Sequence, residues 1–491
     1  EIYTLSLHDA LPISLIYGMN DSGKDELLSS IVYSIITRHT TDEVNLYLVD
    51  FGAETLMNFV DAPQVGDVVL SSDEEKLLNL SKMLNSELLA RKKLFTKYNG
   101  NYKDYLKLSG RSLPNIIVMI NSIEVMNELY LDLIDKFIPV IREGSKYGIY
   151  FIITTESQNS VKLKVSQSCK QILTLQLSNE MAYKDILGKT EGIIPTNNLG
   201  RGLVKIDRVC EFQTAFISND GNQLEAINAL IDKLNETAMS KAMGIPVMPD
   251  IIKLTMFNNK YNGVDSVPVG IAKESLIPSV FDFTKYPSTV ISSNEFDSMK
   301  LFINNFVKTL EVNKNFNRII IDANNYFDNL ESDIEYYNID FNDVIDKLST
   351  ESERLVNIVN QNNMNPRSVS GEKNTLCVII GFEKFFAKLE QEYKDKFIKI
   401  MNDMKEISKI NFVLFDIPGS FKKYEYDEWY KNCINTNDGI WIGQGLTQQF
   451  LLKSLVQLNS FSSIGNDYCC VIKNGMPVIT KIINEIKIDE K

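Results

Sequence analysis

Histidine is nearly absent from this sequence, since only His8 and His39 occur among 491 residues. So few histidines argue against a zinc site and against a histidine-based catalytic triad, because both need histidine beside further ligands or partners. The six cysteines contain no Cys-x-x-Cys pair. That pattern is typical of reduced thiols, mostly in a core, and gives no sign of a disulfide framework.

Long apolar runs and an excess of basic charge are also missing. No apolar run approaches the roughly 20 residues that cross a bilayer, so we expect no membrane span in this chain. The 51 lysine and arginine residues and the 64 aspartate and glutamate residues give a formal net charge of 51 − 64 = −13. This charge opposes nonspecific binding to a phosphate backbone and disfavours a DNA-tracking role, although a local basic patch would still permit one. The length predicts two or three domains.

The most informative motif is the octapeptide Gly18-Met19-Asn20-Asp21-Ser22-Gly23-Lys24-Asp25. It follows the apolar residues 15–17 and precedes a helical pattern, which is the context of a phosphate-binding loop. In such a loop, backbone amides converge on phosphate oxygens, and Lys24 neutralises their charge. Asp25 stands where Ser or Thr normally binds Mg²⁺. The motif predicts nucleotide binding and weakens the case for hydrolysis; a glycine-rich turn without a ligand is the alternative.

A second motif for phosphoryl transfer needs an acidic residue at the end of a buried strand, with a carboxylate beside it. The candidate strand ends at Asn121, with Ser122 after it, so both acidic positions are lost. Glu124 is the nearest carboxylate and is a candidate catalytic residue or a solvated loop residue. Arg201 is a candidate arginine finger for a neighbouring subunit or a solvated turn residue. Asp50, after another buried strand, reads as a turn or cap residue more than a ligand.

The first half alternates strands and helices. Residues 44–49, 116–120 and 150–154 read as buried strands, and residues 72–75 (Ser-Asp-Glu-Glu) as a capping box that opens a long helix. This order predicts an α/β fold with a parallel sheet between helices. An amphipathic helix from Leu224 to Gly244, followed by two prolines, predicts a linker and a domain boundary near residue 250.

The second half repeats this order of elements. Strands are expected at residues 288–291, 318–321, 376–380 and 412–415, with a helix over 297–310. In the first half, the loop starts at Gly18 and the next strand ends at Asp50, a spacing of 50 − 18 = 32 residues. In the second half, the spacing from Ser292 to Asp322 is 322 − 292 = 30 residues. These similar spacings indicate a tandem repeat. Residues 292–299 occupy the loop position without its glycines or lysine and with Glu295 and Asp297. We therefore expect no nucleotide there.

Aromatic residues lie around this second loop, so a helix-binding surface is one hypothesis and core packing the alternative. They are Phe281, Phe283, Phe296, Phe302 and Trp441.

Several short runs are more specific than the phosphate loop. They cover residues 49–54 (Val-Asp-Phe-Gly-Ala-Glu), 62–68 (Ala-Pro-Gln-Val-Gly-Asp-Val), 146–150 (Lys-Tyr-Gly-Ile-Tyr), 200–204 (Gly-Arg-Gly-Leu-Val) and 439–443 (Gly-Ile-Trp-Ile-Gly). With them, the sequence resembles the FtsK/SpoIIIE-type ATPases of type VII secretion over about residues 15–491. The chain looks like the second and third ATPase modules of that family, starting at the second module's phosphate loop.

The resemblance implies two tandem RecA-like P-loop NTPase domains with mainly parallel sheets flanked by helices. It implies ATP as ligand, with Mg²⁺ in question, and recognition of WXG-type secreted substrates. It also implies other secretion-machine subunits as partners, a homo-hexamer, and the cytoplasmic side of the membrane for the full-length protein. A DNA-translocating FtsK/SpoIIIE-type ATPase is the alternative.

The expected organisation has four parts. Residues 1–14 read as a non-native leader, 15–218 as an FtsK-like ATPase domain, 219–250 as a helix and linker, and 251–491 as a degenerate ATPase-like domain for substrate recognition.

Overall fold

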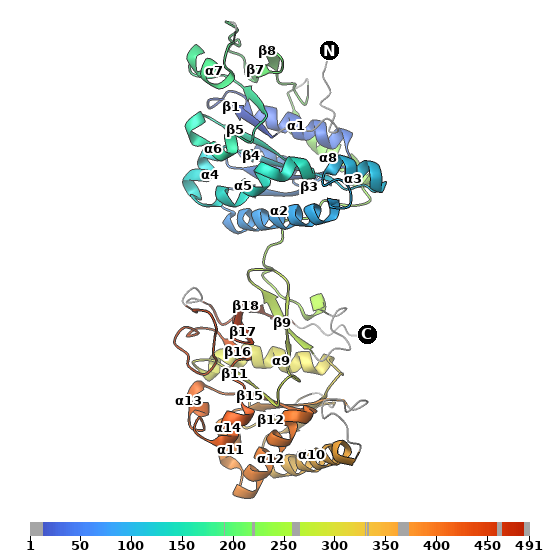
Figure 1. Cartoon of the computed structure of the whole chain (residues 1–491), viewed down its shortest axis with the longest axis vertical. Coiled ribbons are helices and arrows are strands. Elements are labelled where there is room, and N and C mark those ends of the chain that lie inside the picture. Colours follow the sequence, from blue (N-terminus) through green and yellow to red (C-terminus); the bar gives the residue numbers. More distant parts are fainter. Residues whose placement is uncertain are drawn as a thin grey trace. The chain divides into compact units, whose positions relative to one another are not determined.

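The computed structural model describes residues 13–190, 192–218, 221–257, 266–328, 330, 333–361, 373–458 and 464–485. The chain divides into two compact units, Glu1–Val247 and Met248–Lys491 (Figure 1). Each unit is built on a mixed, mostly parallel sheet with helices on both faces. This is the α/β fold expected from the alternation of strands and helices.

The strands of the first unit are β1 (Ser14–Tyr17), β2 (Val44–Asp50), β3 (Val65–Leu70), β4 (Asn115–Asn121), β5 (Ile149–Thr155), β6 (Gln171–Thr174), β7 (Arg201–Lys205) and β8 (Val209–Gln213). Its α-helices are α1 (Lys24–Arg38), α2 (Glu74–Phe95), α3 (Tyr102–Ser109), α4 (Ile123–Leu129), α5 (Leu133–Glu143), α6 (Leu163–Ser166), α7 (Glu180–Leu187) and α8 (Gln223–Thr237). Short 3-10 helices are η2 (Thr55–Phe59), η3 (Gly144–Tyr147) and η4 (Gln158–Ser160).

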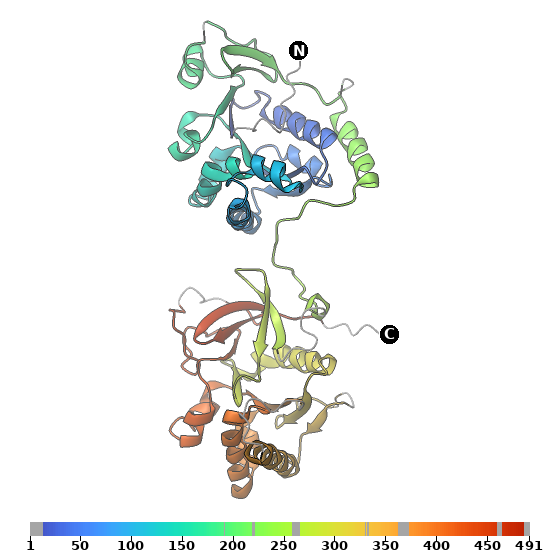
Figure 2. The same ribbon diagram turned by 45° about the vertical axis from the view of Figure 1, so that its right-hand side comes forward.

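The first sheet has the order β3-β2-β4-β5-β1-β6-β7-β8. Strands β1 to β6 pair in parallel, and β7 and β8 are antiparallel additions at one edge. One face packs on α2, α4, α5 and α7, and the other on α1, η2 and α8. Figure 2 shows α8 beside α1. Because alternate residues of a strand point to opposite faces, β4 contributes Val118 to one core and Ile117 to the other.

The strands of the second unit are β9 (Ser266–Ala272), β10 (Pro278–Asp282), β11 (Ser288–Ser292), β12 (Asn317–Asp322), β13 (Glu335–Tyr337), β14 (Thr375–Ile380), β15 (Ile410–Phe415), β16 (Gly439–Ile442), β17 (Tyr468–Lys473) and β18 (Met476–Ile482). Its α-helices are α9 (Lys300–Val312), α10 (Asn342–Gln361), α11 (Phe382–Lys388), α12 (Gln391–Ile407), α13 (Pro418–Lys422) and α14 (Glu428–Cys433), with 3-10 helices η5 (Leu254–Phe257) and η6 (Phe296–Met299).

The second sheet repeats the first. Read from β13, its order is β13-β12-β14-β15-β11-β16-β17-β18-β9-β10, which matches the first sheet strand for strand over eight strands. The direction of pairing also matches, since β16 to β18 are antiparallel as β6 to β8 are. The tandem repeat expected from the sequence is confirmed. Strands β9 and β10 extend the second sheet beyond the repeat.

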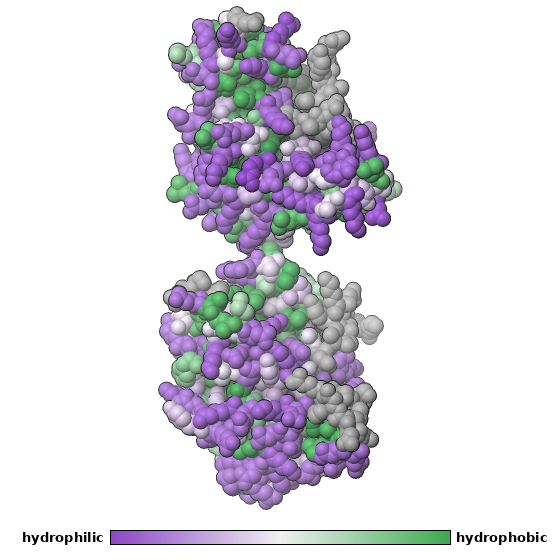
Figure 3. Space-filling model, viewed as in Figure 1, coloured by the Kyte–Doolittle hydropathy of each residue, from purple (hydrophilic) through white to green (hydrophobic). Residues whose placement is uncertain are grey.

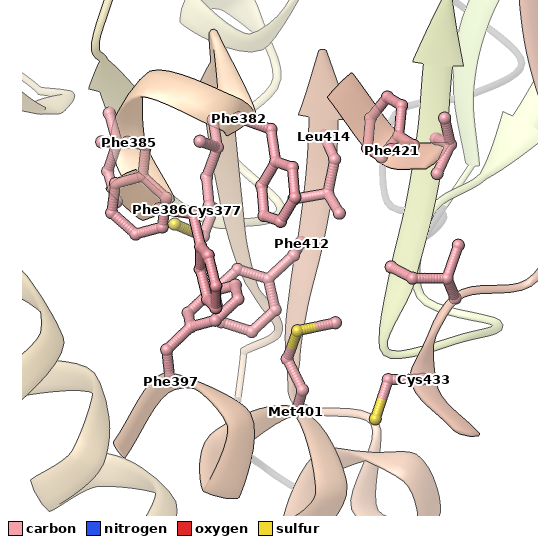
Figure 4. Packing of buried hydrophobic residues seen from close by; sticks show 14 of the residues in the cluster. Cys377, Phe382, Phe385, Phe386, Phe397, Met401, Phe412, Leu414, Phe421 and Cys433 are labelled. Carbon is pink, nitrogen blue, oxygen red and sulfur yellow. The ribbon is translucent and has the colours of Figure 1, made fainter. Parts of the chain in front are cut away.

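The second unit has two aromatic-rich cores. One includes Phe382, Phe397, Phe412 and Phe421. In Figure 4, Phe412 of β15 lies above Phe397 of α12, and Phe382 and Phe421 come from the short helices α11 and α13 at the upper end of the strands. The rings of Phe382 and Phe421 are stacked, with centroids 5.5 Å apart.

On the face seen in Figure 3, hydrophilic side chains predominate and apolar ones are scattered. None of the helices in the described residues is long and apolar enough to span a bilayer.

Three local expectations are wrong. Asp73, and not Ser72, precedes α2, and its side chain makes no cap hydrogen bond, so the capping box does not form. Helix α8 ends at Thr237, seven residues before Gly244, and it packs on the first unit through Ile227 and Ile231. Gly244 and the prolines after it follow an extended segment and not the helix itself, so they do not mark the end of α8.

The expected start of the fold at residue 15 is also too late. Ser14 begins β1 and pairs with both β5 and β6, and the carbonyl of the buried Ile13 accepts a hydrogen bond from the amide of Lys170. Residues 1–12 lie outside the described residues.

Candidate functional site

The loop at residues 18–25 joins β1 to α1 at the carboxyl edge of the first sheet. The Gly18 amide donates to the carbonyl of Thr155 in β5 (3.0 Å), and the Met19 amide donates to the carbonyl of Gln176 after β6 (2.9 Å). The loop is therefore held between the two strands that flank β1. Helix α1 begins at Lys24, and its first-turn amides have no partner within the helix. These amides and the helix dipole favour an anion at this point.

The side chain of Lys24 is buried inside this loop, with 8% of its surface exposed. Its Nζ donates to the carbonyl of Gly18 (2.8 Å) and lies 3.8 Å from the carboxylate of Glu156. Ser22 is also buried, and its hydroxyl has no partner among the described residues. An ammonium group held by a loop carbonyl can exchange this partner for a phosphate oxygen, which makes a charge-assisted hydrogen bond.

Both glycines of the motif are required by the shape of the loop. A Cβ atom on Gly18 would lie 2.4 Å from Oγ of Ser22. Gly23 has φ of +96°, and a Cβ there would lie 2.5 Å from the amide nitrogen of Gly200. The Gly200 amide donates to the carbonyl of Ser22 (3.0 Å), so the segment before β7 covers the phosphate loop. No local sequence pattern predicts this contact, because it joins residues 178 positions apart (200 − 22).

Asp25 and Asn121, the two departures from the nucleotide-hydrolysis motifs, are in direct contact. The amide nitrogen Nδ2 of Asn121 donates to Oδ1 of Asp25 (2.6 Å) and to Oδ1 of Asp50 (2.9 Å). Asp50 also accepts the backbone amides of Gly52 and Leu56, both at 3.0 Å. Asp50 therefore acts as a turn-capping residue, fully buried at the end of β2. Strands β2 and β4 are paired neighbours, which brings Asp50 opposite Asn121.

The two candidate catalytic residues have different surroundings. Glu124 lies in the first turn of α4, directly after β4, and its Oε2 is buried with no partner among the described residues. Arg201 begins β7, next to the Gly200 that contacts the phosphate loop of its own chain. Nε of Arg201 donates to Oε1 of Glu211 (2.8 Å), and this hydrogen bond lowers the pKa of Glu211. Both residues stay candidates.

The matching loop of the second unit has a different character. Residues 292–299 join β11 to α9 as expected, through η6. The hydroxyl of Ser292 donates to the carbonyl of Asp416 (2.7 Å), and Asp297 pairs with Lys300 (2.7 Å). Met299, the residue directly before α9, is fully buried in the core. Lys300 begins α9 as Lys24 begins α1, but its side chain is 49% exposed, so residues 292–299 enclose no buried ammonium like that of the first site.

The aromatic residues proposed as a helix-binding surface lie mainly in the core. Phe281, Phe283, Phe302 and Trp441 are at most 4% exposed, and Phe296 is half-buried against the same core. The core-packing alternative is therefore confirmed for the four buried residues, which cannot serve as docking anchors, and only Phe296 is partly exposed.

A glycine-rich loop with a buried lysine, placed between a strand and a helix at the carboxyl edge of a parallel sheet, defines the P-loop NTPase class. The chain carries two domains of this fold in tandem, and residues 292–299 of the second lack the glycines and the lysine of the loop.

Comparison with known proteins agrees with this assignment to the P-loop NTPase class. Residues 6–186 match the FtsK/SpoIIIE family. The chain is homologous to the EssC/YukB type VII secretion ATPases: EssC of Staphylococcus aureus (strain NCTC 8325 / PS 47) is 24% identical over 302 residues, covering 59% of this chain and 20% of EssC. YukB of Bacillus subtilis (strain 168) is 24% identical over 289 residues, covering 56% of this chain and 19% of YukB. The chain thus spans about a fifth of the length of these curated relatives.

Solved structures show the same fold. ATPases 2 and 3 of EssC from Geobacillus thermodenitrificans align with a TM-score of 0.79 over 98% of this chain and 92% of that chain, at 19% identity. ATPases 2 and 3 of EccC from Thermomonospora curvata, in complex with a signal sequence peptide, align with a TM-score of 0.56 over 96% of this chain and 88% of that chain, at 17% identity.

Proposed function

We propose that the first unit binds one ATP at residues 18–25, as part of a type VII secretion ATPase. The observation that supports this most directly is Lys24, whose ammonium is buried in the loop and donates to the carbonyl of Gly18. The charge of this ammonium, the first-turn amides of α1 and the two glycines form a phosphate cradle. The second unit has neither the glycines nor a buried lysine in residues 292–299, and we propose that it binds no nucleotide in the usual way.

Titration of a fluorescent ATP analogue into the full chain tests this proposal. We expect one site per chain, and Lys24→Ala should weaken binding about 10–100-fold, since a hydrogen bond to a charged group is lost. Lys97→Ala, at an exposed position just after α2, is the matched control. Two sites per chain, or unchanged affinity in Lys24→Ala, would contradict the proposal.

We propose that ATP hydrolysis by this chain is slow and that nucleotide binding fixes the conformation of the first unit. Asp25 and Asn121 replace the hydroxyl and the carboxylate that hold Mg²⁺ in an active site, and only Glu124 and Arg201 are left as candidate catalytic residues. A coupled phosphate-release assay on the full chain should give little turnover, and Glu124→Gln should abolish what remains if Glu124 is the base. Rapid hydrolysis that disappears in Lys24→Ala would show that the motifs are functional as they stand.

We propose that the second unit recognises WXG-type secreted substrates, so that the chain couples ATP binding to their export. Support comes from homology to EssC and YukB and from the EccC structure, whose ATPases 2 and 3 hold a signal sequence peptide. Photo-cross-linking of a substrate tail peptide to the full chain should label residues beyond 248 without added nucleotide. Labelling confined to the first unit, or labelling that needs ATP, would contradict the assignment.

In the full-length protein, we propose a homo-hexamer on the cytoplasmic side of the membrane, with other secretion-machine subunits as partners. The relatives are components of such secretion systems. Single-particle imaging of the full-length protein in detergent tests the hexamer.

A further inference from the structure

In the contact between Asp25 and Asn121, the hydrogen-bond donor and acceptor have exchanged places relative to the usual pair at this site. In an active P-loop site, a Ser or Thr hydroxyl lies beside the carboxylate at the end of the neighbouring strand, and both serve Mg²⁺. Here the loop supplies the carboxylate and the strand supplies the donor, with Nδ2 of Asn121 2.6 Å from Oδ1 of Asp25. The two substitutions, 96 positions apart (121 − 25), therefore compensate for each other.

The orientation of the Asn121 amide is fixed by its surroundings. The backbone amide of Ser122 donates to Oγ1 of Thr154 (2.8 Å), so the hydroxyl proton of Thr154 is free to donate to Oδ1 of Asn121 (2.7 Å). Since Oδ1 of Asn121 accepts this bond, Nδ2 faces the two carboxylates of Asp25 and Asp50. Asn121 is fully buried, and both N–H groups and the oxygen of its amide have partners.

This arrangement does not fit Mg²⁺. The ion requires oxygen ligands in a near-octahedral shell at about 2.0–2.1 Å, and the strand end presents an N–H₂ group instead. The Asp50 carboxylate accepts Asn121, Gly52 and Leu56, so it is also occupied. The buried, unpartnered hydroxyl of Ser22 lies in the same loop and provides a free polar group for a phosphate ligand.

We propose that Asp25 and Asn121 are a coupled positioning pair that makes the first unit bind nucleoside triphosphate independently of Mg²⁺. The inference rests on the proposed nucleotide site. The Asn121 amide takes the place of the cation, because it offers positive N–H dipoles to the two carboxylates that would otherwise repel each other. Lys24 and the amides of the loop then carry the phosphate charge by themselves.

The coupling is tested on the full chain without nucleotide, by thermal unfolding of single and double variants. Asn121→Asp alone puts three carboxylates in contact and should lower the Tm of the first unit by about 4–8 °C. Adding Asp25→Thr should restore part of that loss, since the new hydroxyl donates to the new carboxylate while the contact with Asp50 is unchanged. Asn115→Asp, the same change at the buried start of β4, is the control that Asp25→Thr should not rescue. Equal losses with and without Asp25→Thr would overturn the coupling.

The metal dependence is tested by ATP titration in EDTA and in excess Mg²⁺. The unmodified chain should bind with affinities that agree within about threefold, whereas Asp25→Thr with Asn121→Asp should bind about tenfold more tightly with Mg²⁺. Binding by the unmodified chain that is lost in EDTA would overturn the inference. Absence of binding in both conditions would instead refute the proposed nucleotide site, while the thermal unfolding series would still decide whether the pair is coupled.

Discussion

At the residue scale, matching positions of the two units show which features belong to the fold and which to a ligand. Asp50 and Asp322 end matching strands, and each accepts the amide two residues later, at 3.0 Å from Gly52 and at 3.2 Å from Asn324. This aspartate is therefore structural in both units. The residues at the start of the following helix differ instead: Lys24 begins α1 with its side chain buried in the loop, whereas Met299, directly before α9, is buried in the core.

Backbone strain leads to a prediction at one pair of matching positions in the two units, Ser122 and Gly381. Ser122 has φ of +60° before α4, and Gly381 has φ of +79° before α11. A left-handed conformation costs an L-residue about 1–2 kcal/mol. Glycine also raises the entropy of the unfolded chain, which offsets part of this gain, so Ser122→Gly should stabilise the first unit by about 0.5–1 kcal/mol. Urea unfolding measures this change.

The reverse substitution is the control. Gly381→Ser should destabilise the second unit, since a Cβ there would lie 2.7 Å from the side chain of Asn324. A loss of stability in Ser122→Gly would mean that its hydroxyl has a role that outweighs the strain.

Thiol reactivity gives a prediction about pH. Burial raises the pKa of the Cys433 thiol to about 11 and that of Cys470 to about 12. At pH 8 these thiols are protonated and should resist iodoacetamide in the folded chain, whereas the half-buried Cys210 is labelled first. Mass spectrometry after timed alkylation measures the order; rapid labelling of Cys470 without denaturant would contradict it.

The same raised pKa values predict loss of stability in alkali. A folded-state pKa above the unfolded value favours the fold while the thiol stays protonated. The contribution of these thiols is complete below about pH 9, the ordinary range of a thiol, and is lost as pH rises towards 12.

At the element scale, the repeat is carried by the order and direction of the strands. The units differ where a turn or an edge was changed: η6 lengthens the turn before α9, and β9 and β10 extend only the second sheet. Strand β9 approaches β18 closely at Gly270, where a Cβ atom would lie 1.8 Å from the carbonyl oxygen of Lys481. A side chain at this position is excluded by the pairing itself.

Gly270→Ala should therefore destabilise the second unit by about 1–3 kcal/mol or detach β9 and β10 from the sheet, as overpacking does elsewhere. Gly419→Ala in α13, with open space around its Cβ position, is the control and should be neutral or slightly stabilising. Hydrogen exchange of peptides from β9 and β18 distinguishes local detachment from global loss. Unchanged exchange and stability in Gly270→Ala would contradict the prediction, because they would show that the paired strands accommodate the methyl group.

At the scale of the whole molecule, two units of one fold carry one predicted nucleotide site. ATP at about 100 times its Kd should stabilise the first unit by about 2.7 kcal/mol, because it binds only the folded state. Hydrogen exchange should then slow in peptides from β1 and α1 and stay unchanged in those from β11 and α9. Equal protection of both regions would indicate a second site; no protection in Lys24→Ala confirms that the effect depends on the loop.

The sequence by itself determined the α/β class, the position of the phosphate loop and the tandem repeat. These properties depend on local patterns: apolar runs of strand length, a loop motif between a strand and a helix, and the same order of elements twice. Resemblance to the secretion ATPases rested on runs of five to seven residues. Helix ends were less predictable, as at Gly244, because glycine and proline also mark extended segments.

Only the tertiary structure decided how distant residues combine. The sheet order places β2 beside β4, so Asn121 meets Asp25 and Asp50, and two apparent defects become one hydrogen-bonded pair. The same folding buries Phe283 and Trp441 and lays Gly200 on the phosphate loop. A single sequence lists side chains without their neighbours, and contacts across a sheet depend on strand order and register, which no local pattern encodes.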